Sequence, residues 1–136
     1  MLNFKNILYP IDLDSQKITS LEKALEVAQF FNCPIHILYV NDIEAGYRHP
    51  TDREDAVALR VKELIPESLL EGLKIIYAVS KGDTAEEILQ YAYGNNIDLI
   101  VIGHKNRGKL YAALFDSTDV NIIDQVSLPV LVVPEQ

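Results

Sequence analysis

The sequence predicts an α/β fold built on one parallel β-sheet with helices on both faces. Short β-branched, apolar runs alternate with longer stretches whose apolar residues recur at helical spacing. Several of the short runs are apolar on consecutive residues, as strands buried on both faces require. The 136 residues are 49% hydrophobic and 24% charged, which is typical of one globular domain. We therefore expect a single domain, residues 1–136, with a doubly wound, Rossmann-like sheet of five strands in the order 3-2-1-4-5.

Five segments have the composition of strands. They are Asn6–Asp12, Ile35–Val40, Leu73–Val79, Leu99–Gly103 and Val130–Val133. Pro34 and Pro129 stand at the entries to two of them, where a missing N–H costs least. Pro10 differs because it lies inside the first run, which a doubly wound sheet places at its centre. We therefore expect the pairing of the first strand to weaken near its end.

Two of the intervening segments carry helix-start signals. Thr19 with Glu22, and Thr84 with Glu87, have the spacing of a capping box. The pair Gly94-Asn95 supplies a stop for the second helix. The apolar residues at helical spacing are Leu21, Ala24, Leu25 and Ala28 in the first helix and Ala85, Ile88, Leu89 and Ala92 in the second.

Two further helices and one loop complete the predicted elements. The segment from Asp52 to about Leu70 is helical but interrupted by Pro66, because proline breaks the backbone hydrogen-bond ladder. A shorter helix covers Asp116–Gln125, and Asn41–Asp52 reads as a loop.

Ligands of open parallel sheets bind beyond the carboxyl ends of the strands, where the strand order reverses. Three segments follow predicted strands and so meet this condition: Asp12–Ser15, Val40–Asp42 and Gly103–Lys109. The two carboxylates of the first segment, Asp12 and Asp14, favour turn or cap formation, with contact between Asp12 and a polar ligand as the alternative.

The third segment is basic within an acidic chain. Lys105, Arg107 and Lys109 are three of 12 basic residues in a protein with 20 acidic residues and a formal charge of −8. Such a cluster favours an anion: Gly103 lets the backbone approach a phosphate, and a helix N-terminus near Ser117 donates N–H groups. The alternative is a solvated basic loop.

Other functional classes lack support in the sequence. His36, His49 and His104 show no metal-ligand spacing, and Cys33, the one cysteine, reads as a core residue. No nucleophile elbow or P-loop is present, so the sequence predicts no catalyst. The seven tyrosines, including Tyr47, do not alternate regularly with basic residues, as nucleic-acid stacking would require. We interpret them as core or interface residues.

The charge balance and the apolar runs also bear on partners and location. An acidic chain opposes attraction to nucleic acid and to anionic lipid. The longest apolar runs fall well short of the roughly 18 residues of a membrane span. The N-terminus has no apolar secretory segment, so we expect the protein in the cytoplasm.

Three segments together resemble the universal stress protein family over essentially the whole chain. Asn6–Asp12, with its Pro-x-Asp ending, is similar to the family's first strand. Gly82–Ile88 followed by Asn96–Gly103 is similar to its third helix and fourth strand, and Leu128–Pro134 resembles its last strand. The resemblance implies a five-stranded parallel fold of the adenine nucleotide alpha hydrolase-like type, dimerisation through the last strand, and a regulatory or ligand-sensing role in stress resistance.

The same resemblance places a nucleotide motif after the fourth strand. Nucleotide-binding members carry Gly, two residues, Gly, nine residues, and then Gly with Ser or Thr. Gly103 and Ser117 match this motif, whereas Asn106 and Asp116 replace the other two glycines. A carboxylate about 5 Å from a phosphate charge costs about 3 kcal/mol at an effective dielectric near 20. Gly108 restores backbone freedom if the loop takes another register, and magnesium or the loop cations offset the charge.

On the adenine side the family's positions are retained. Pro10 and Asp12 match, and Val40 stands where the second strand offers its backbone to the base. This mixture is closer to the family branch that lacks the glycine motif and does not hold ATP.

Three functional interpretations follow. The first is a dimeric regulatory or sensing protein with weak or absent ATP binding. The second binds ATP or AMP with magnesium, and hydrolyses ATP slowly, with Gly103, Asn106, Arg107 and Ser117 on phosphate and Asp12 with Val40 on the nucleoside. The third is an electron-transfer or other nucleotide-cofactor domain of similar architecture.

The final strand supplies the expected partner. The run Val130, Leu131, Val132 and Val133 is hydrophobic and is expected at a sheet edge, which proteins usually cover. We expect a second copy of the chain to cover it.

Overall fold

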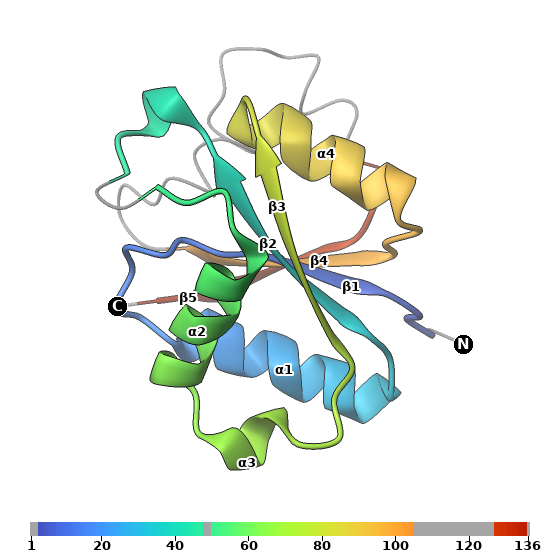
Figure 1. Ribbon diagram of the computed structural model, residues 1–136. Helices are drawn as coiled ribbons and strands as arrows, with labels where there is room; N and C mark the ends of the chain where they lie inside the picture. The colour runs from blue at the N-terminus through green and yellow to red at the C-terminus, as the bar shows by residue number, and fades with distance from the viewer. Residues whose placement is uncertain (1–2, 48–49, 105–126, 136) are drawn as a thin grey trace.

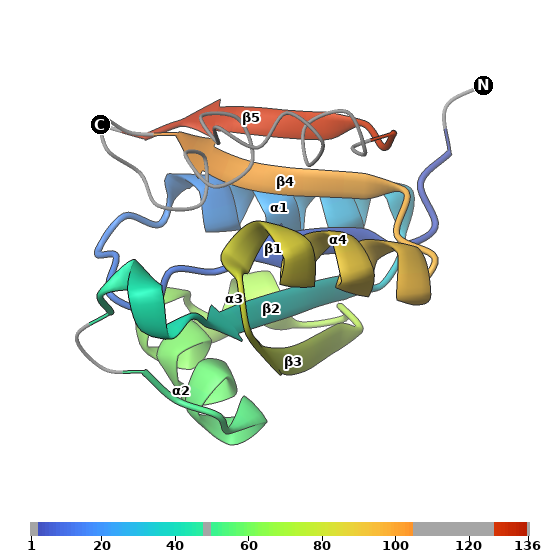
Figure 2. The same ribbon diagram turned by 90° about the horizontal axis from the view of Figure 1, so that it is seen from above.

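The computed structural model describes residues 3–47, 50–104 and 127–135. Within them, five strands form one parallel sheet in the order β3-β2-β1-β4-β5, with β1 at the centre (Figures 1 and 2). The strands are β1 (Ile7–Pro10), β2 (Ile35–Asn41), β3 (Ile75–Lys81), β4 (Leu99–His104) and β5 (Val130–Pro134). The predicted α/β class and strand order are confirmed.

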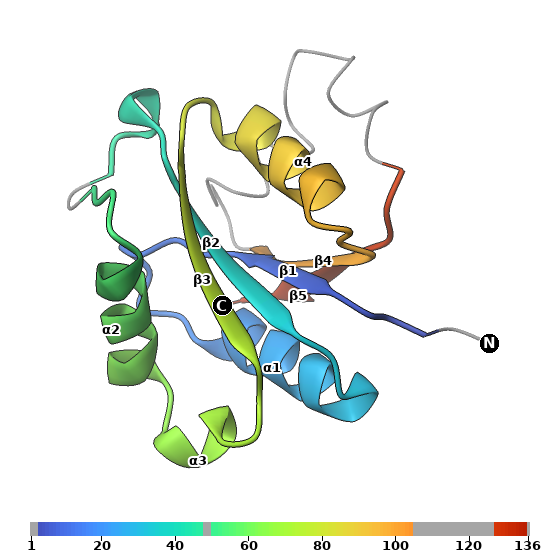
Figure 3. The ribbon, with the colours of Figure 1, turned by 45° about the vertical axis from the view of Figure 1, so that its right-hand side comes forward.

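Helices cover both faces of the sheet. The described helices are α1 (Thr19–Phe31), α2 (Glu54–Leu64), α3 (Glu67–Leu70), α4 (Thr84–Gly94) and a 3-10 turn, η1 (Ile43–Ala45). Among the described helices, α1 and α2 pack on one face and α4 packs on the other (Figure 3). The predicted break at Pro66 is confirmed, because this residue caps α3 directly after α2 has ended. The predicted helix over 116–125 lies outside the described residues. No described helix has the length and apolar character needed to cross a membrane.

The core is divided by the sheet into two layers, because successive side chains of a strand point to opposite faces. Ile7 and Tyr9 of β1 belong to the cluster under α1 and α2, whereas Leu8 belongs to the cluster under α4. Both layers continue into β4, where Val101 and Ile102 alternate in the same way. The consecutive apolar residues that predicted doubly covered strands therefore fill two separate layers.

The first strand is shorter than predicted, and its pairing weakens near Pro10 as expected. β1 pairs with β2 over four residues that end at Pro10 and Leu38. Its pairing with β4 covers only Ile7 and Leu8. The two central strands thus separate toward their carboxyl ends, where a ligand site of this fold class lies.

Both predicted capping boxes are wrong. The N-cap of α1 is Ile18, which makes no side-chain cap. The N-cap of α4 is Asp83, whose carboxylate accepts a hydrogen bond from the backbone N–H of Glu86, while Thr84 lies inside the helix. In each case a carboxylate distant in the sequence binds the first turn, as described below, and removes the need for the local pair.

Candidate functional site

The loop after β1 is a tight turn built on Asp12. The Asp12 carboxylate accepts a hydrogen bond from the N–H of Asp14 at 3.0 Å, and its carbonyl accepts one from Ser15 at 3.1 Å. The predicted turn is therefore confirmed. The side chain of Asp12 is half-buried, so this turn leaves it within reach of the carboxyl edge of the sheet.

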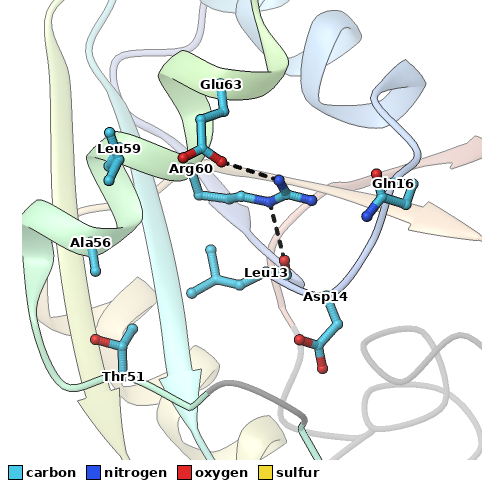
Figure 4. A pocket seen from close by; sticks show the side chains of 8 residues that line it. All are labelled: Leu13, Asp14, Gln16, Thr51, Ala56, Leu59, Arg60 and Glu63. Atoms are coloured by element: carbon cyan, nitrogen blue, oxygen red, sulfur yellow. Dashed lines mark hydrogen bonds and ion pairs between the residues drawn. The ribbon is translucent and has the colours of Figure 1, made fainter.

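Helix α2 holds this turn from the side (Figure 4). The Arg60 guanidinium donates from Nε to the carbonyl of Leu13 at 3.2 Å and from Nη2 to the carbonyl of Ser15 at 3.3 Å. Glu63 pairs with the remaining nitrogen, Nη1, at 3.3 Å. One arginine thus bridges two of the carbonyls that follow Asp12, a fixed fork that lysine does not offer.

A cavity of about 420 Å³ lies between this turn and α2. Figure 4 shows the eight side chains that line it, of which five are polar or charged and three are apolar. The lining residues are Leu13, Asp14, Gln16, Thr51, Ala56, Leu59, Arg60 and Glu63. The cavity borders the Asp12 turn, so it is adjacent to the edge where the sequence places the nucleoside.

At the end of β2, the backbone of Val40 faces a gap left by β1. Its side chain is buried under α4, so only its backbone is available to a ligand. Leu38 directs its carbonyl toward β1, where it accepts a hydrogen bond from Ile11 at 2.8 Å. Because backbone groups two residues apart point the same way, the N–H and C=O of Val40 also face that side. There the chain has already turned away at Asp12.

Two tyrosines border the same edge. Burial, with smaller contributions from Asp14 and Asp12, raises the pKa of the buried Tyr39 hydroxyl to about 12. The ring of Tyr47 lies 5.4 Å from that of Tyr39. Burial and the nearby Asp12 carboxylate raise the pKa of Tyr47. The sequence identified Tyr47 only as core or interface, yet its hydroxyl lies in the field of Asp12.

The N-terminus of α4 is filled by carboxylates. Asp42, which follows β2, accepts hydrogen bonds at 2.9 Å from the N–H and at 2.8 Å from the hydroxyl of Thr84. Its other oxygen accepts from the N–H of Glu44 at 3.0 Å. These contacts join the ends of β2 and α4 and use donors that would otherwise attract an external anion.

The N-terminus of α1 is occupied in the same way, from the other end of the chain. Glu135, directly after β5, accepts hydrogen bonds from the N–H of Ser20 at 2.8 Å and from its hydroxyl at 2.7 Å. Its second oxygen lies beside Gly103: a Cβ at position 103 would stand 2.5 Å from Oε2 of Glu135 and 2.7 Å from Oγ of Ser20. The absence of a side chain at Gly103 therefore makes room for these two groups.

The structure brings together the four predicted site residues that it describes. Pro10, Asp12, Val40 and Gly103 all lie at the carboxyl ends of β1, β2 and β4. The other predicted site residues, Lys105, Asn106, Arg107, Gly108 and Ser117, lie outside the described residues, as does Asp116. Glu135, Ser20 and Arg60 were missed by sequence reasoning, because no short spacing connects them to the site.

Comparison with known proteins gives consistent matches. The family model of the universal stress protein family matches residues 3–134. A universal stress protein of Methanocaldococcus jannaschii is 27% identical over 139 residues, which cover 96% of this chain and 82% of the relative.

Solved structures share the fold. A universal stress protein in complex with cAMP matches with a TM-score of 0.68 at 14% identity, over 99% of this chain and all of that one. The protein UspA of Lactobacillus plantarum gives 0.67 at 21% identity, over 98% and 99% of the two chains. A universal stress protein of Archaeoglobus fulgidus in complex with dAMP gives 0.58 at 20% identity, over 96% and 98%.

Proposed function

Because the chain belongs to the universal stress protein family, we propose that it is a ligand-sensing stress protein that binds an adenine nucleotide of the AMP type. In this proposal the binding of ATP is weak or absent. The ligand lies at the carboxyl edge of the sheet, with its base at Asp12 and the backbone of Val40 and its phosphate toward Gly103.

The observation that carries this proposal is the gap beyond the paired part of β1. Pairing between β1 and β2 ends at Pro10 and Leu38, and the half-buried Asp12 turn stands beside the backbone of Val40. A backbone N–H with a neighbouring C=O matches the edge of an adenine, and a carboxylate is a natural acceptor for ribose hydroxyls. The complexes of related folds with cAMP and with dAMP support the same class of ligand.

Weak ATP binding follows from charge. Asp116 and Asn106 replace two glycines of the family's phosphate motif. In the described part of the same edge, Asp42 and Glu135 already occupy the first turns of α4 and α1. Each added phosphate charge is therefore repelled by these fixed negative charges, and an AMP-type ligand is repelled least.

Isothermal titration of the purified protein with AMP, cAMP and ATP, each with and without magnesium, tests the proposal. We expect AMP or cAMP to bind more tightly than ATP. We expect D12N to weaken the binding of AMP and of cAMP. The control is E67Q, which removes the same charge from α3, at the opposite end of the sheet (Figure 1). A submicromolar dissociation constant for ATP contradicts the weak-ATP proposal, and binding of no adenine ligand contradicts nucleotide sensing.

We also propose that a second copy of the chain covers β5. This strand forms an edge of the sheet, and the side chains of Leu131 and Val132 are 40% and 36% exposed. Exposed apolar edge strands invite pairing with another strand. Light scattering is expected to give a dimer at micromolar concentration, and V132K is expected to give a monomer. A wild-type monomer at that concentration contradicts the proposal.

A further inference from the structure

We infer that Glu135 determines how much negative charge the proposed nucleotide site accepts. Its carboxylate, fixed between Gly103 and the first turn of α1, selects against ligands with several phosphate groups and favours monophosphate or cyclic phosphate ligands. The inference rests on the proposed nucleotide binding and assigns the charge preference of that site to one residue.

Glu135 is held in place by its backbone and by its side chain. Its N–H donates to the carbonyl of His104 at 2.7 Å, which continues the pairing of β5 with β4. Both donors of Ser20 bind its Oε1. The carboxylate thus connects the end of the chain to the start of α1 and has little freedom to move away from an incoming anion.

A third residue completes this arrangement. The hydroxyl of Tyr9 lies 2.7 Å from Oγ of Ser20. Because the one hydroxyl proton of Ser20 is donated to Glu135, Tyr9 must be the donor in this contact. Burial raises the pKa of Tyr9, so the tyrosine keeps its proton. Tyr9 donates to Ser20 and Ser20 donates to the carboxylate; both side chains are neutral, so the formal charge of Glu135 stays in place.

The carboxylate lies on the α1 face of β4, directly against Gly103. Val101 faces the α1 layer. A side chain at position 103, two residues later, would face the same layer, and glycine leaves that space open. Glu135 and Ser20 fill that space. A ligand phosphate that approaches the backbone of Gly103 therefore meets a fixed negative charge immediately behind it.

The described neighbours of Glu135 leave its negative charge without an ion-pair partner. Within the described residues, the ion pairs involve other side chains, and none places a lysine or arginine on Glu135. For charges about 8 Å apart at an effective dielectric of about 40, each ligand charge loses about fivefold in affinity, which corresponds to about 1 kcal/mol.

The test compares wild type with E135Q, whose amide keeps an oxygen that accepts from Ser20. AMP, ADP and ATP without magnesium are titrated calorimetrically at low ionic strength. We expect E135Q to shift the ratio of ATP to AMP affinity toward ATP by about fivefold to 25-fold, since ATP carries about two more charges. We expect E67Q to leave this ratio within twofold. An unchanged ratio in E135Q overturns the inference even when nucleotides bind.

A second variant separates charge from packing. S20A keeps the carboxylate but removes one of its donors. If Glu135 acted only by tying β5 to α1, S20A and E135Q would change the ratio in the same direction. We expect no gain for ATP in S20A, and a gain equal to that of E135Q contradicts the electrostatic inference.

A third measurement does not depend on nucleotide binding. Inorganic tripolyphosphate and inorganic phosphate are titrated while the amide resonance of Gly103 is followed by NMR. We expect E135Q to bind tripolyphosphate at least fivefold more tightly than wild type does, with a smaller change for phosphate. If wild type binds no adenine ligand, the proposed function fails, and equal tripolyphosphate binding by the two proteins then overturns the charge inference as well.

Discussion

Replacing Gly103 by alanine tests the arrangement at the end of β4. A Cβ built at this position stands 2.5 Å from Oε2 of Glu135 and 2.7 Å from Oγ of Ser20, both too close for non-bonded atoms. Overpacking of this kind costs about 1–3 kcal/mol. Moving Glu135 aside instead gives up two hydrogen bonds to a charged acceptor, each worth about 1.5–3 kcal/mol when well shielded and less at a half-buried site.

These costs are partly offset in the unfolded chain. Replacing glycine by alanine removes conformational freedom there and stabilises the protein by about 0.4–1 kcal/mol. We therefore expect G103A to lower the free energy of unfolding by about 1–2 kcal/mol. Urea denaturation followed by circular dichroism measures this change.

A matched control and a second background identify the cause. An added Cβ at Gly94, at the end of α4, meets no atom within 4 Å, so G94A is expected to be neutral or slightly stabilising. In an E135A background one of the two close contacts is absent, and the cost of G103A is expected to fall by about 1 kcal/mol. If G103A is as stable as wild type, or if its cost is the same in both backgrounds, the assigned role of Gly103 is refuted.

Three further predictions concern other contacts of the fold. D42A removes the acceptor for both donors of Thr84 and is expected to lower the free energy of unfolding by about 1–2 kcal/mol in the same denaturation assay. Burial, and to a lesser extent Lys74, lowers the pKa of His36 below its ordinary 6.5, so the unfolded chain binds the proton more tightly. The free energy of unfolding is therefore expected to decrease as the pH falls below about 6.5, and H36Q is expected to reduce this slope, measured as the difference between the two proteins. R60K is expected to keep the fold but to raise amide hydrogen exchange over residues 13–16, since lysine does not bridge two carbonyls; unchanged exchange there contradicts the role of Arg60.

Much of the fold follows from local patterns. Consecutive apolar residues such as Ile100, Val101 and Ile102 predicted buried parallel strands, because each strand has to fill two layers. Pro10 predicted the early end of pairing in β1, since proline has no N–H to donate. These features depend on one residue type or on spacings of a few residues, which the sequence displays directly.

The errors have one physical origin. Thr19 and Thr84 carry the local spacing of capping boxes, but the first turns of α1 and α4 are bound by Glu135 and Asp42. The contact between Ser20 and Glu135 joins residues 115 positions apart. Such contacts form only once the assembled sheet brings distant segments together, and no short sequence motif predicts them.

The same distinction between local patterns and distant contacts applies to the candidate site. Composition predicted that Asp12 and Val40 lie at strand ends, and the structure confirms these places. Their contact with adenine is what the family resemblance implies and stays a prediction. The surroundings of Gly103 were not predicted, since its neighbours come from α1 and from the end of the chain. The sequence suggested that Gly103 contacts a phosphate. In the structure its lack of a side chain also leaves room for the carboxylate of Glu135.

An NMR titration with AMP tests the central proposal most directly, because it locates the ligand as well as detecting it. We predict saturable shifts of the amide resonances of Asp12, Val40 and Gly103, with little change at the amino end of the sheet around His36. Absence of shifts at these three residues, or shifts confined to another surface, contradicts an adenine-nucleotide site at the carboxyl edge.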